Sequence, residues 1–198
     1  MRRGPGFVVT LLAVMATPSE AQVTAPLNTP LPALVTPAAP PGTRLESFVP
    51  EGGSVATLGY EELGTLGRNR ISVEVRQVRD GKGNSASGVA VLVSEGPARL
   101  ERAFVDVDEI PDVLKGLDAL LAIRGNPTPF KKFESRFTTR GLLSFVAYSN
   151  TTGAIEYSVQ AGRPLPATVV NLDAVEVLKM RSMLETAQHQ LREGGLVR

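Results

Sequence analysis

The chain has 198 residues, with 21 Lys and Arg against 20 Asp and Glu, a single histidine and no cysteine. Without cysteine it forms no disulfide and supplies no thiol nucleophile or Fe–S ligand, and one histidine is too few for a His-rich zinc site. The nearly balanced charge gives no overall attraction to nucleic acid or to an anionic membrane. The fold therefore depends on an apolar core.

The N-terminus has the pattern of an export signal. Arg2 and Arg3 precede the uncharged, mostly apolar run 7–16, and the tripeptide 19–21 has small residues at the two positions that a signal peptidase reads. The run is shorter than the about 20 apolar residues that span a bilayer, so no transmembrane span is expected in the mature chain. The sequence predicts cleavage before Gln22 and an exported, periplasmic or secreted, protein. Retention of the run as a short membrane anchor is the alternative.

Removal of residues 1–21 leaves 19 basic and 19 acidic residues. Residues 22–50 are rich in proline and contain one residue of each charge sign. Repeated proline excludes regular hydrogen-bonded structure, so this stretch is predicted to be a disordered linker that tethers the domain. The alternative is that this proline-rich stretch binds a partner protein. Residues 51–198 are long enough to form a single α+β domain with one core.

The first half of the domain has strand patterns followed by a helix pattern. Ile71, Val73 and Val75 alternate with polar residues, and Asp80–Asn84 has the composition of a turn. Apolar residues from Ile110 to Leu121 recur at helical spacing. Asp108 is the predicted N-cap and Gly125 the predicted stop. The expected strands are 60–66, 71–76, 89–93 and 103–107.

The second half repeats this order. Asp173 and Glu176 have the spacing of a capping box, and Gly194 with Gly195 is predicted to end the helix. Apolar residues at spacings of three and four form the buried stripe of that helix: Val177, Met180, Leu184, Ala187 and Leu191. The expected strands are 130–139, 143–147, 155–159 and 168–172.

The stretches VDVDEIPDVL (105–114) and VNLDAVEVL (170–178) share one plan, a strand end, an Asp cap and an apolar helix start. The predicted fold class is α+β, with antiparallel sheets and two packing helices. A duplicated unit of three or four strands and a helix would give halves at 58–125 and 130–194. Two unrelated strand meanders are the alternative.

Aromatic and basic residues interleave from Phe130 to Phe137. Such a surface can stack bases while it follows phosphates, and a duplicated unit of four strands and a helix resembles the Whirly and PUR-repeat single-strand nucleic-acid binders in fold alone. An ordinary strand with Phe133 and Phe137 buried is the favoured interpretation, because the mature charge is neutral. The candidate ligand patch consists of Lys131, Lys132, Arg136 and Arg140.

The densest acidic cluster lies at the expected start of the first helix. Carboxylates at this spacing could bind Ca²⁺, but acids at a helix N-terminus also stabilise the helix dipole, which is the favoured interpretation. His189 has no nearby motif that would orient it, so it is interpreted as a solvated helix residue. The cluster consists of Asp106, Asp108, Glu109 and Asp112.

These observations predict no catalytic residue, no cofactor and no metal site. The function that they favour is a non-enzymatic binding or interaction domain, exported on a tether, for a protein or small ligand, with no nucleic-acid partner. The alternative is a hydrolase that needs only carboxylates, for which two of them must face each other across a cleft. Its candidates are Glu74, Asp106, Asp108 and Glu156.

Overall fold

Eight strands form two antiparallel four-stranded sheets in the computed structural model, which describes residues 42–50, 52–162 and 167–193. Each sheet keeps the strands in chain order and is followed by a helix. Sheet A contains β1 (Ala56–Leu66), β2 (Ile71–Asp80), β3 (Ser85–Gly96) and β4 (Arg99–Asp106). Sheet B contains β5 (Glu134–Thr138), β6 (Leu143–Ser149), β7 (Ile155–Ala161) and β8 (Thr168–Leu172). The helices are α1 (Arg44–Ser47), α2 (Ile110–Leu121) and α3 (Ala174–Glu193).

The α+β class with antiparallel sheets is confirmed. Several predicted bounds differ from the structure. The strands of sheet A are longer than expected: β1 begins at Ala56, β2 continues to Asp80, and β3 and β4 begin at Ser85 and Arg99. The strand expected over 130–139 is shortened to β5, and α2 ends at Leu121 instead of continuing to Gly125, which lies in the following loop with φ +67°. The expected signal at 1–21, the linker as far as residue 41 and the helix stop at Gly194 lie outside the described residues. Within the described part, no helix is long and apolar enough to cross a membrane.

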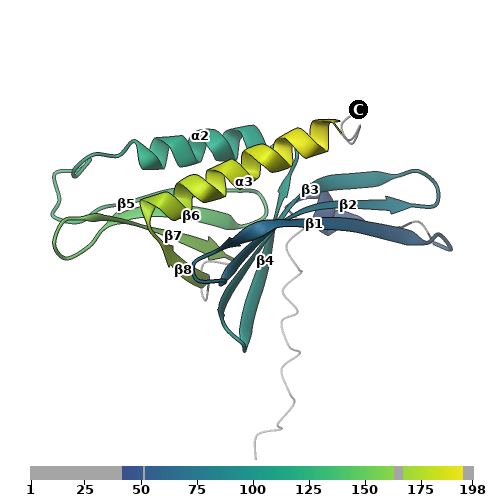
Figure 1. Cartoon of the computed structure of the whole chain (residues 1–198), viewed down its shortest axis with the longest axis horizontal. Coiled ribbons are helices and arrows are strands. Elements are labelled where there is room, and N and C mark those ends of the chain that lie inside the picture. The colour runs from purple at the N-terminus through teal and green to yellow at the C-terminus, as the bar shows by residue number, and fades with distance from the viewer. Residues whose placement is uncertain (1–41, 51, 163–166, 194–198) are drawn as a thin grey trace, which may run out of the picture. The chain divides into compact units, whose positions relative to one another are not determined.

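One apolar core joins both sheets to α2 and α3. Strand alternation sends every second residue of β2 and β3 into it, and the helices contribute stripes at spacings of three and four. In Figure 1, α2 and α3 run side by side; α2 lies over sheet B, whereas α3 passes from sheet B over sheet A, and the far ends of β1, β2 and β3 extend past it. None of the three described helices lies on the opposite face of sheet B (Figure 1).

The turns of sheet A pack against β8. The Glu95 carboxylate, near the end of β3, accepts a hydrogen bond of 2.7 Å from the Val169 N–H. Gly67, between β1 and β2, has φ +61°, and a Cβ there would lie 2.6 Å from a Val170 methyl carbon. Its N–H donates to Glu176 at 2.9 Å. The outer edge of β8 is therefore covered by sheet A.

The order of four strands and a helix occurs twice. When the ends of β4 and β8 are aligned, the strand pairing gives residues of sheet A counterparts in sheet B. At the end of β4, Asp106 pairs with Gly88, and at the end of β8, Asn171 pairs with Ser158. On the next strand of each sheet, Gly88 pairs with Arg76 of β2 and Ser158 pairs with Val146 of β6. The origin of the two units by duplication stays a prediction.

Candidate functional site

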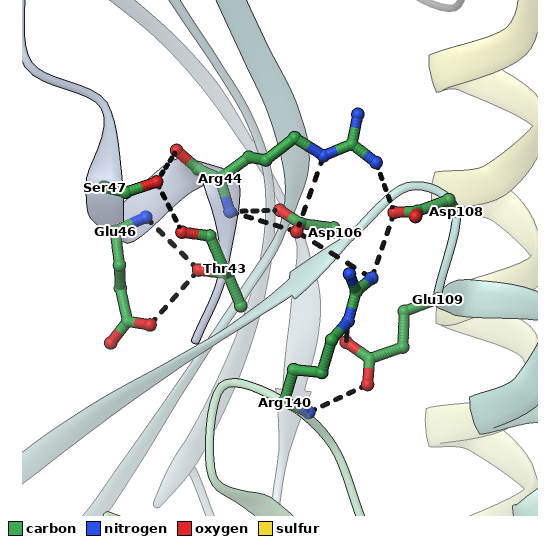
Figure 2. Close-up of polar contacts among 8 residues, drawn as sticks. All are labelled: Thr43, Arg44, Glu46, Ser47, Asp106, Asp108, Glu109 and Arg140. Carbon is green, nitrogen blue, oxygen red and sulfur yellow. Dashed lines mark hydrogen bonds and ion pairs between the residues drawn. The ribbon is translucent and has the colours of Figure 1, made fainter. Parts of the chain in front are cut away.

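Residues 42–47, called the docking segment below, are bound to sheet A through Asp106 (Figure 2). This aspartate ends β4 and is 1% exposed. Both of its carboxylate oxygens accept from the backbone N–H of Arg44, at 3.1 and 3.0 Å. Thr43 caps α1, because its Oγ1 accepts from the Glu46 N–H at 3.2 Å. The last part of the expected linker is thus folded onto the domain, where the chain from 42 to 49 contains no proline.

Two guanidinium groups converge on the acids at this end of β4 (Figure 2). Arg44 and Arg140 both contact Asp108 Oδ1, at 2.8 and 3.1 Å, and each has a nitrogen 3.8 Å from Asp106 Oδ2. Arg140 also bonds Glu109, through its backbone N–H at 2.8 Å and through Nε at 3.4 Å. The two guanidinium groups therefore neutralise two of the three carboxylate charges in this network.

The electrostatics of this network follow from those contacts. Partial burial alone would raise the pKa of Asp108, but the hydrogen bond and charge of Arg140, with the charge of Arg44, hold it below its ordinary value. Burial likewise opposes the charge on Arg140, yet its bond to Asp108 raises the pKa of the guanidinium. Both groups stay ionised at neutral pH, so the network is set up for pairing and not for proton transfer.

Glycines allow the backbones around the docking segment to approach each other closely. A Cβ on Gly141 would lie 2.1 Å from the Phe104 carbonyl oxygen, and one on Gly42 would lie 2.1 Å from the Arg140 carbonyl oxygen. On β3, a Cβ on Gly88 would lie 3.0 Å from a Leu45 methyl carbon. Backbone atoms cannot move aside as a flexible side chain does, so a side chain at Gly42 would displace the docking segment. One at Gly141 would force the β5–β6 turn away from β4, and one at Gly88 would lie 2.2 Å from the Val105 carbonyl oxygen of β4.

The acidic cluster has a structural role, and the predicted one holds in part, since Asp112 lies in the first turn of α2. The prediction that Asp108 caps α2 is wrong: the helix begins at Ile110, and its N-cap, Glu109, makes no side-chain cap bond. Asp108 instead contacts the two arginines, and Asp112 pairs with Lys115 at 3.0 Å. Among the described residues, no group of three or more His, Asp or Glu is arranged to hold a metal ion.

The structure does not join the four basic residues of the candidate patch around one partner. Lys131 and Lys132 are exposed in the loop before β5. Arg136 lies on β5 and bonds Glu134 and Gln160, whereas Arg140 faces the acids that follow β4. Both arginines of the patch are thus already paired with carboxylates.

The aromatic residues of this stretch have three different environments. Phe133 is buried, with 8% exposure, whereas Phe130 is 73% exposed. Phe137 is half-buried, and its ring packs on α2, where a Cβ added to Gly116 would lie 2.6 Å from it. The favoured interpretation as a strand with buried aromatics therefore agrees with Phe133 and in part with Phe137.

A second region, the outer face of sheet B, was not recognised from the sequence. It consists of the side chains that alternate with the core-facing residues on the four strands, and α2 and α3 pack on the other side. Its members are mostly polar. They are Glu134, Arg136, Thr138, Ser144, Val146, Tyr148, Glu156, Ser158, Gln160, Val169 and Asn171.

Two long side chains lie across this face. Arg136 on β5 reaches Gln160 on β7, with Nη1 2.8 Å from Oε1, and so passes over β6, where Val146 is only 2% exposed. The Tyr148 hydroxyl donates to Glu156 at 3.1 Å. Burial, followed by the bond and charge of Glu156, raises the pKa of Tyr148, so its hydroxyl keeps its proton at neutral pH.

Two hollows adjoin these residues. The β8 hollow, about 490 Å³, lies between the β1–β2 turn and the β8–α3 junction. The β6 hollow, about 270 Å³, has the hydroxyls of Thr138 and Ser144 and the amide of Gln160 in its wall. The β8 hollow is lined by Gly67, Arg68, Arg70, Glu156, Asn171, Leu172, Asp173 and Glu176. The β6 hollow is lined by Arg136, Thr138, Leu142, Ser144, Gln160, Gly162 and Ala167.

The carboxylates proposed for a hydrolase are spread over different partners. Glu74 pairs with Arg76 on the outer face of sheet A. Asp106 and Asp108 belong to the arginine network, and Glu156 lines the β8 hollow, where it accepts from Tyr148 and Asn150. The two other acids of that hollow, Asp173 and Glu176, bond each other's backbone N–H groups as the predicted capping box.

His189 agrees with its interpretation as a solvated helix residue. Its side chain is 69% exposed, and Nδ1 lies 3.1 Å from a carboxylate oxygen of Glu193, one turn further along α3.

No protein-family model matches the chain, and a comparison with curated proteins gives no match either. The function is therefore inferred from the chain's own residues.

Proposed function

We propose that this chain is an exported, tethered binding domain that takes an uncharged, hydroxyl-rich ligand of the saccharide class on the outer face of sheet B. In this proposal residues 1–21 direct export and residues 22–41 tether the domain. The ligand lies across β5–β8, between the β6 hollow and the β8 hollow. The domain binds this ligand without converting it.

The observation that carries the proposal is the hydrogen-bonding character of the β6 hollow. Thr138, Ser144 and Gln160 offer neutral donors and acceptors, and the Thr138 and Ser144 hydroxyls already bond each other at 2.8 Å. Sugar hydroxyls both donate and accept, so they can join such a network. The charged group in this wall, Arg136, is paired with Glu134 and so attracts anions weakly.

The β8 hollow extends the same chemistry. Asn171 is exposed there, and Arg68 and Arg70 balance part of the charge of the three acids in its wall. Side-chain amides and partly paired charges are groups that bind hydroxyls without requiring a charged ligand. The ligand favoured by the two hollows is therefore a neutral oligosaccharide long enough to contact both.

The alternatives receive less support from the geometry. A hydrolase needs an acid with a raised pKa and a free carboxylate facing it. Glu74, Asp106 and Asp108 are held by arginines, and Asp173 and Glu176 are occupied as a helix cap. A single-strand nucleic-acid binder needs unpaired cations along a groove, whereas Arg76, Arg136 and Arg140 each pair with a carboxylate.

The test is a screen of the purified protein against a panel of neutral oligosaccharides, followed by calorimetric titration of any binder. Gln160→Ala and Asn171→Ala should each weaken binding about tenfold, because each removes one hydrogen-bonding amide worth about 1–1.5 kcal/mol. Gln188→Ala on α3 is the matched control and should leave the affinity unchanged.

Three outcomes would contradict the proposal. The first is that no neutral saccharide binds, and the second is that the two variants bind as well as the unmodified protein. The third is binding of single-stranded oligonucleotides at low salt together with no saccharide binding, which would favour the nucleic-acid alternative.

A further inference from the structure

The edges of the two sheets are covered to different degrees. The β4 edge meets Gly141 and the docking segment, and the β8 edge is bonded by Glu95. The β5 strand has five residues, of which three are exposed. The β1 strand has 11 residues and lies at the end of the strand order, and β2 is its one partner among the strands that the structure describes. A long uncovered edge is a template for another strand.

The first part of β1 is exposed on both of its faces. Residues 56–62 are all exposed, and only from Leu63 onward does the strand enter the core. Two large apolar side chains point to one face, Leu58 with 50% and Tyr60 with 69% exposure. Exposed apolar side chains on an unpaired strand edge are typical of an interaction surface.

We propose that β1 pairs antiparallel with β1 of a second copy of this chain, about a two-fold axis at Gly59. In that register Leu58 of each copy lies opposite Tyr60 of the other, so the four apolar side chains form one cluster. Glu61 lies opposite Thr57, and no two like charges face each other. The two A sheets then form one continuous sheet.

Neighbouring registers are less favourable. A two-fold axis at Glu61 would place this carboxylate against its own copy, and like charges directly opposite are destabilising. An axis at Tyr60 would place Leu58 opposite Glu62. The register at Gly59 therefore follows from the charge and apolar pattern of the strand itself, and this self-complementarity favours a second copy over a foreign strand.

The expected dimer is weak and depends on concentration. A single strand pair over residues 56–62 buries less than the about 1,200–2,000 Å² of a stable interface. The bulge between Glu62 and Gly64 breaks the regular pairing of β1 and so limits its length.

The first experiment is sedimentation velocity on the full chain over a range of concentrations. The unmodified protein should shift from monomer to dimer. An acidic variant, Leu58→Glu with Tyr60→Glu, and a basic variant, Leu58→Lys with Tyr60→Lys, should each stay monomeric, because like charges then face each other. Their equimolar mixture should dimerise again, an outcome that misfolding cannot produce. Leu100→Glu, at an apolar residue of β4 that is 59% exposed, is the matched control and should dimerise normally.

The second experiment tests the register and uses the absence of cysteine from the chain. A Cβ on Gly59 would have 4.0 Å to its nearest contact, the Gln77 carbonyl oxygen, so Gly59→Cys fits. In the proposed dimer the two copies of this residue face each other at a Cα separation of about 4.5–5.5 Å, which suits a disulfide. Mild oxidation should therefore join two Gly59→Cys chains.

Thr57→Cys is the control for that experiment. Its two copies would be four residues apart along the strands, about 13 Å, which is beyond disulfide reach. Monomeric protein at every concentration would overturn the proposal, as would equal cross-linking of the two cysteine variants. Failure of the mixed acidic and basic variants to associate would overturn it as well.

Discussion

The two strand–helix junctions share a sequence plan but differ in what surrounds them. At the β4–α2 junction, Asp106 is buried and bound by the docking segment. At the β8–α3 junction, Asn171 has the same position in the strand pairing, and it is exposed at the β8 hollow. The first junction is filled by the docking segment, whereas the second is contacted by the β1–β2 turn and keeps a hollow beside Asn171.

The aspartate that both junctions share, Asp108 in the first and Asp173 in the second, also differs in its contacts. Asp173 caps α3, with its Oδ1 accepting from the Glu176 N–H at 2.8 Å. Asp108, its counterpart, leaves α2 without a side-chain cap and bonds Arg44 and Arg140. Asp108 therefore pairs with two arginines from distant parts of the chain, although the local sequence predicts that it caps the helix.

The largest expected effect comes from crowding the close approach between the β5–β6 turn and β4. Gly141→Ala would bring its Cβ to 2.1 Å from the Phe104 carbonyl oxygen, so the turn or the strand must move. We expect the free energy of unfolding, measured by urea denaturation, to fall by about 3 kcal/mol. Gly52→Ala is the control, since a Cβ there has no atom within 4 Å. Equal stability of the two variants would show that the β5–β6 turn is not tightly packed on β4.

Removal of the buried carboxylate at the first junction should lower the free energy of unfolding more than the matching change at the second. Asp106→Ala leaves the Arg44 N–H without its acceptor and removes a buried carboxylate that lies 3.8 Å from both guanidinium groups, so we expect the free energy of unfolding to fall by about 2 kcal/mol. Asn171→Ala, at the exposed counterpart, should cost less than about 0.5 kcal/mol. Asp106→Asn, which gives the first junction the residue of the second, should lie between them. Similar losses at both positions would contradict the contrast.

The cap of α3 gives a smaller expected effect. Glu176→Ala removes bonds to the Asp173 N–H and to the Gly67 N–H, so unfolding should become easier by about 1 kcal/mol. Glu109→Ala at α2 removes no cap bond but does remove the contact to Arg140, and circular dichroism on heating compares the two variants. A greater loss of helix signal in Glu109→Ala would contradict the assigned roles.

The smallest expected effect is in the acid range. The pKa of Asp108 is lower in the folded protein than its ordinary value of 3.8, so its stabilising contribution is present above that value. It is lost as the pH falls through the folded pKa. The pair is half exposed, so the loss is less than about 1 kcal/mol. Denaturation between pH 5 and pH 2 should show a smaller decline for Asp108→Asn; an identical decline would argue against the pairing.

Most of the fold could be predicted because its signals are local. The alternation at Ile71, Val73 and Val75 and the stripe of α3 each depend on residues within a few positions of one another. The capping box of Asp173 and Glu176 was found for the same reason. The order of strands within each sheet follows from the short turns that join them.

What the sequence could not show depends on contacts between distant residues. The bond from Arg44 to Asp106 joins residues 62 positions apart, and no local pattern indicates it. The spacing of Thr43 and Glu46 is a capping signal that indicates α1. The proline-rich sequence before it nevertheless predicts a linker through residue 50. The polar residues of sheet B alternate normally along each strand, and only the pairing register shows that Arg136 and Gln160 meet.

The attachment of the docking segment has a mechanical consequence. A pull on the chain before residue 42 reaches the Arg44–Asp106 bonds and the crowded contacts at Gly42 before it reaches β1. The load is then carried by several bonds at the end of β4 and shared with α2 through Arg140 and Glu109. The force therefore does not act first on the hydrogen bonds between β1 and β2. Under tension on the proposed tether, β1 and the outer face of sheet B would therefore keep their shape.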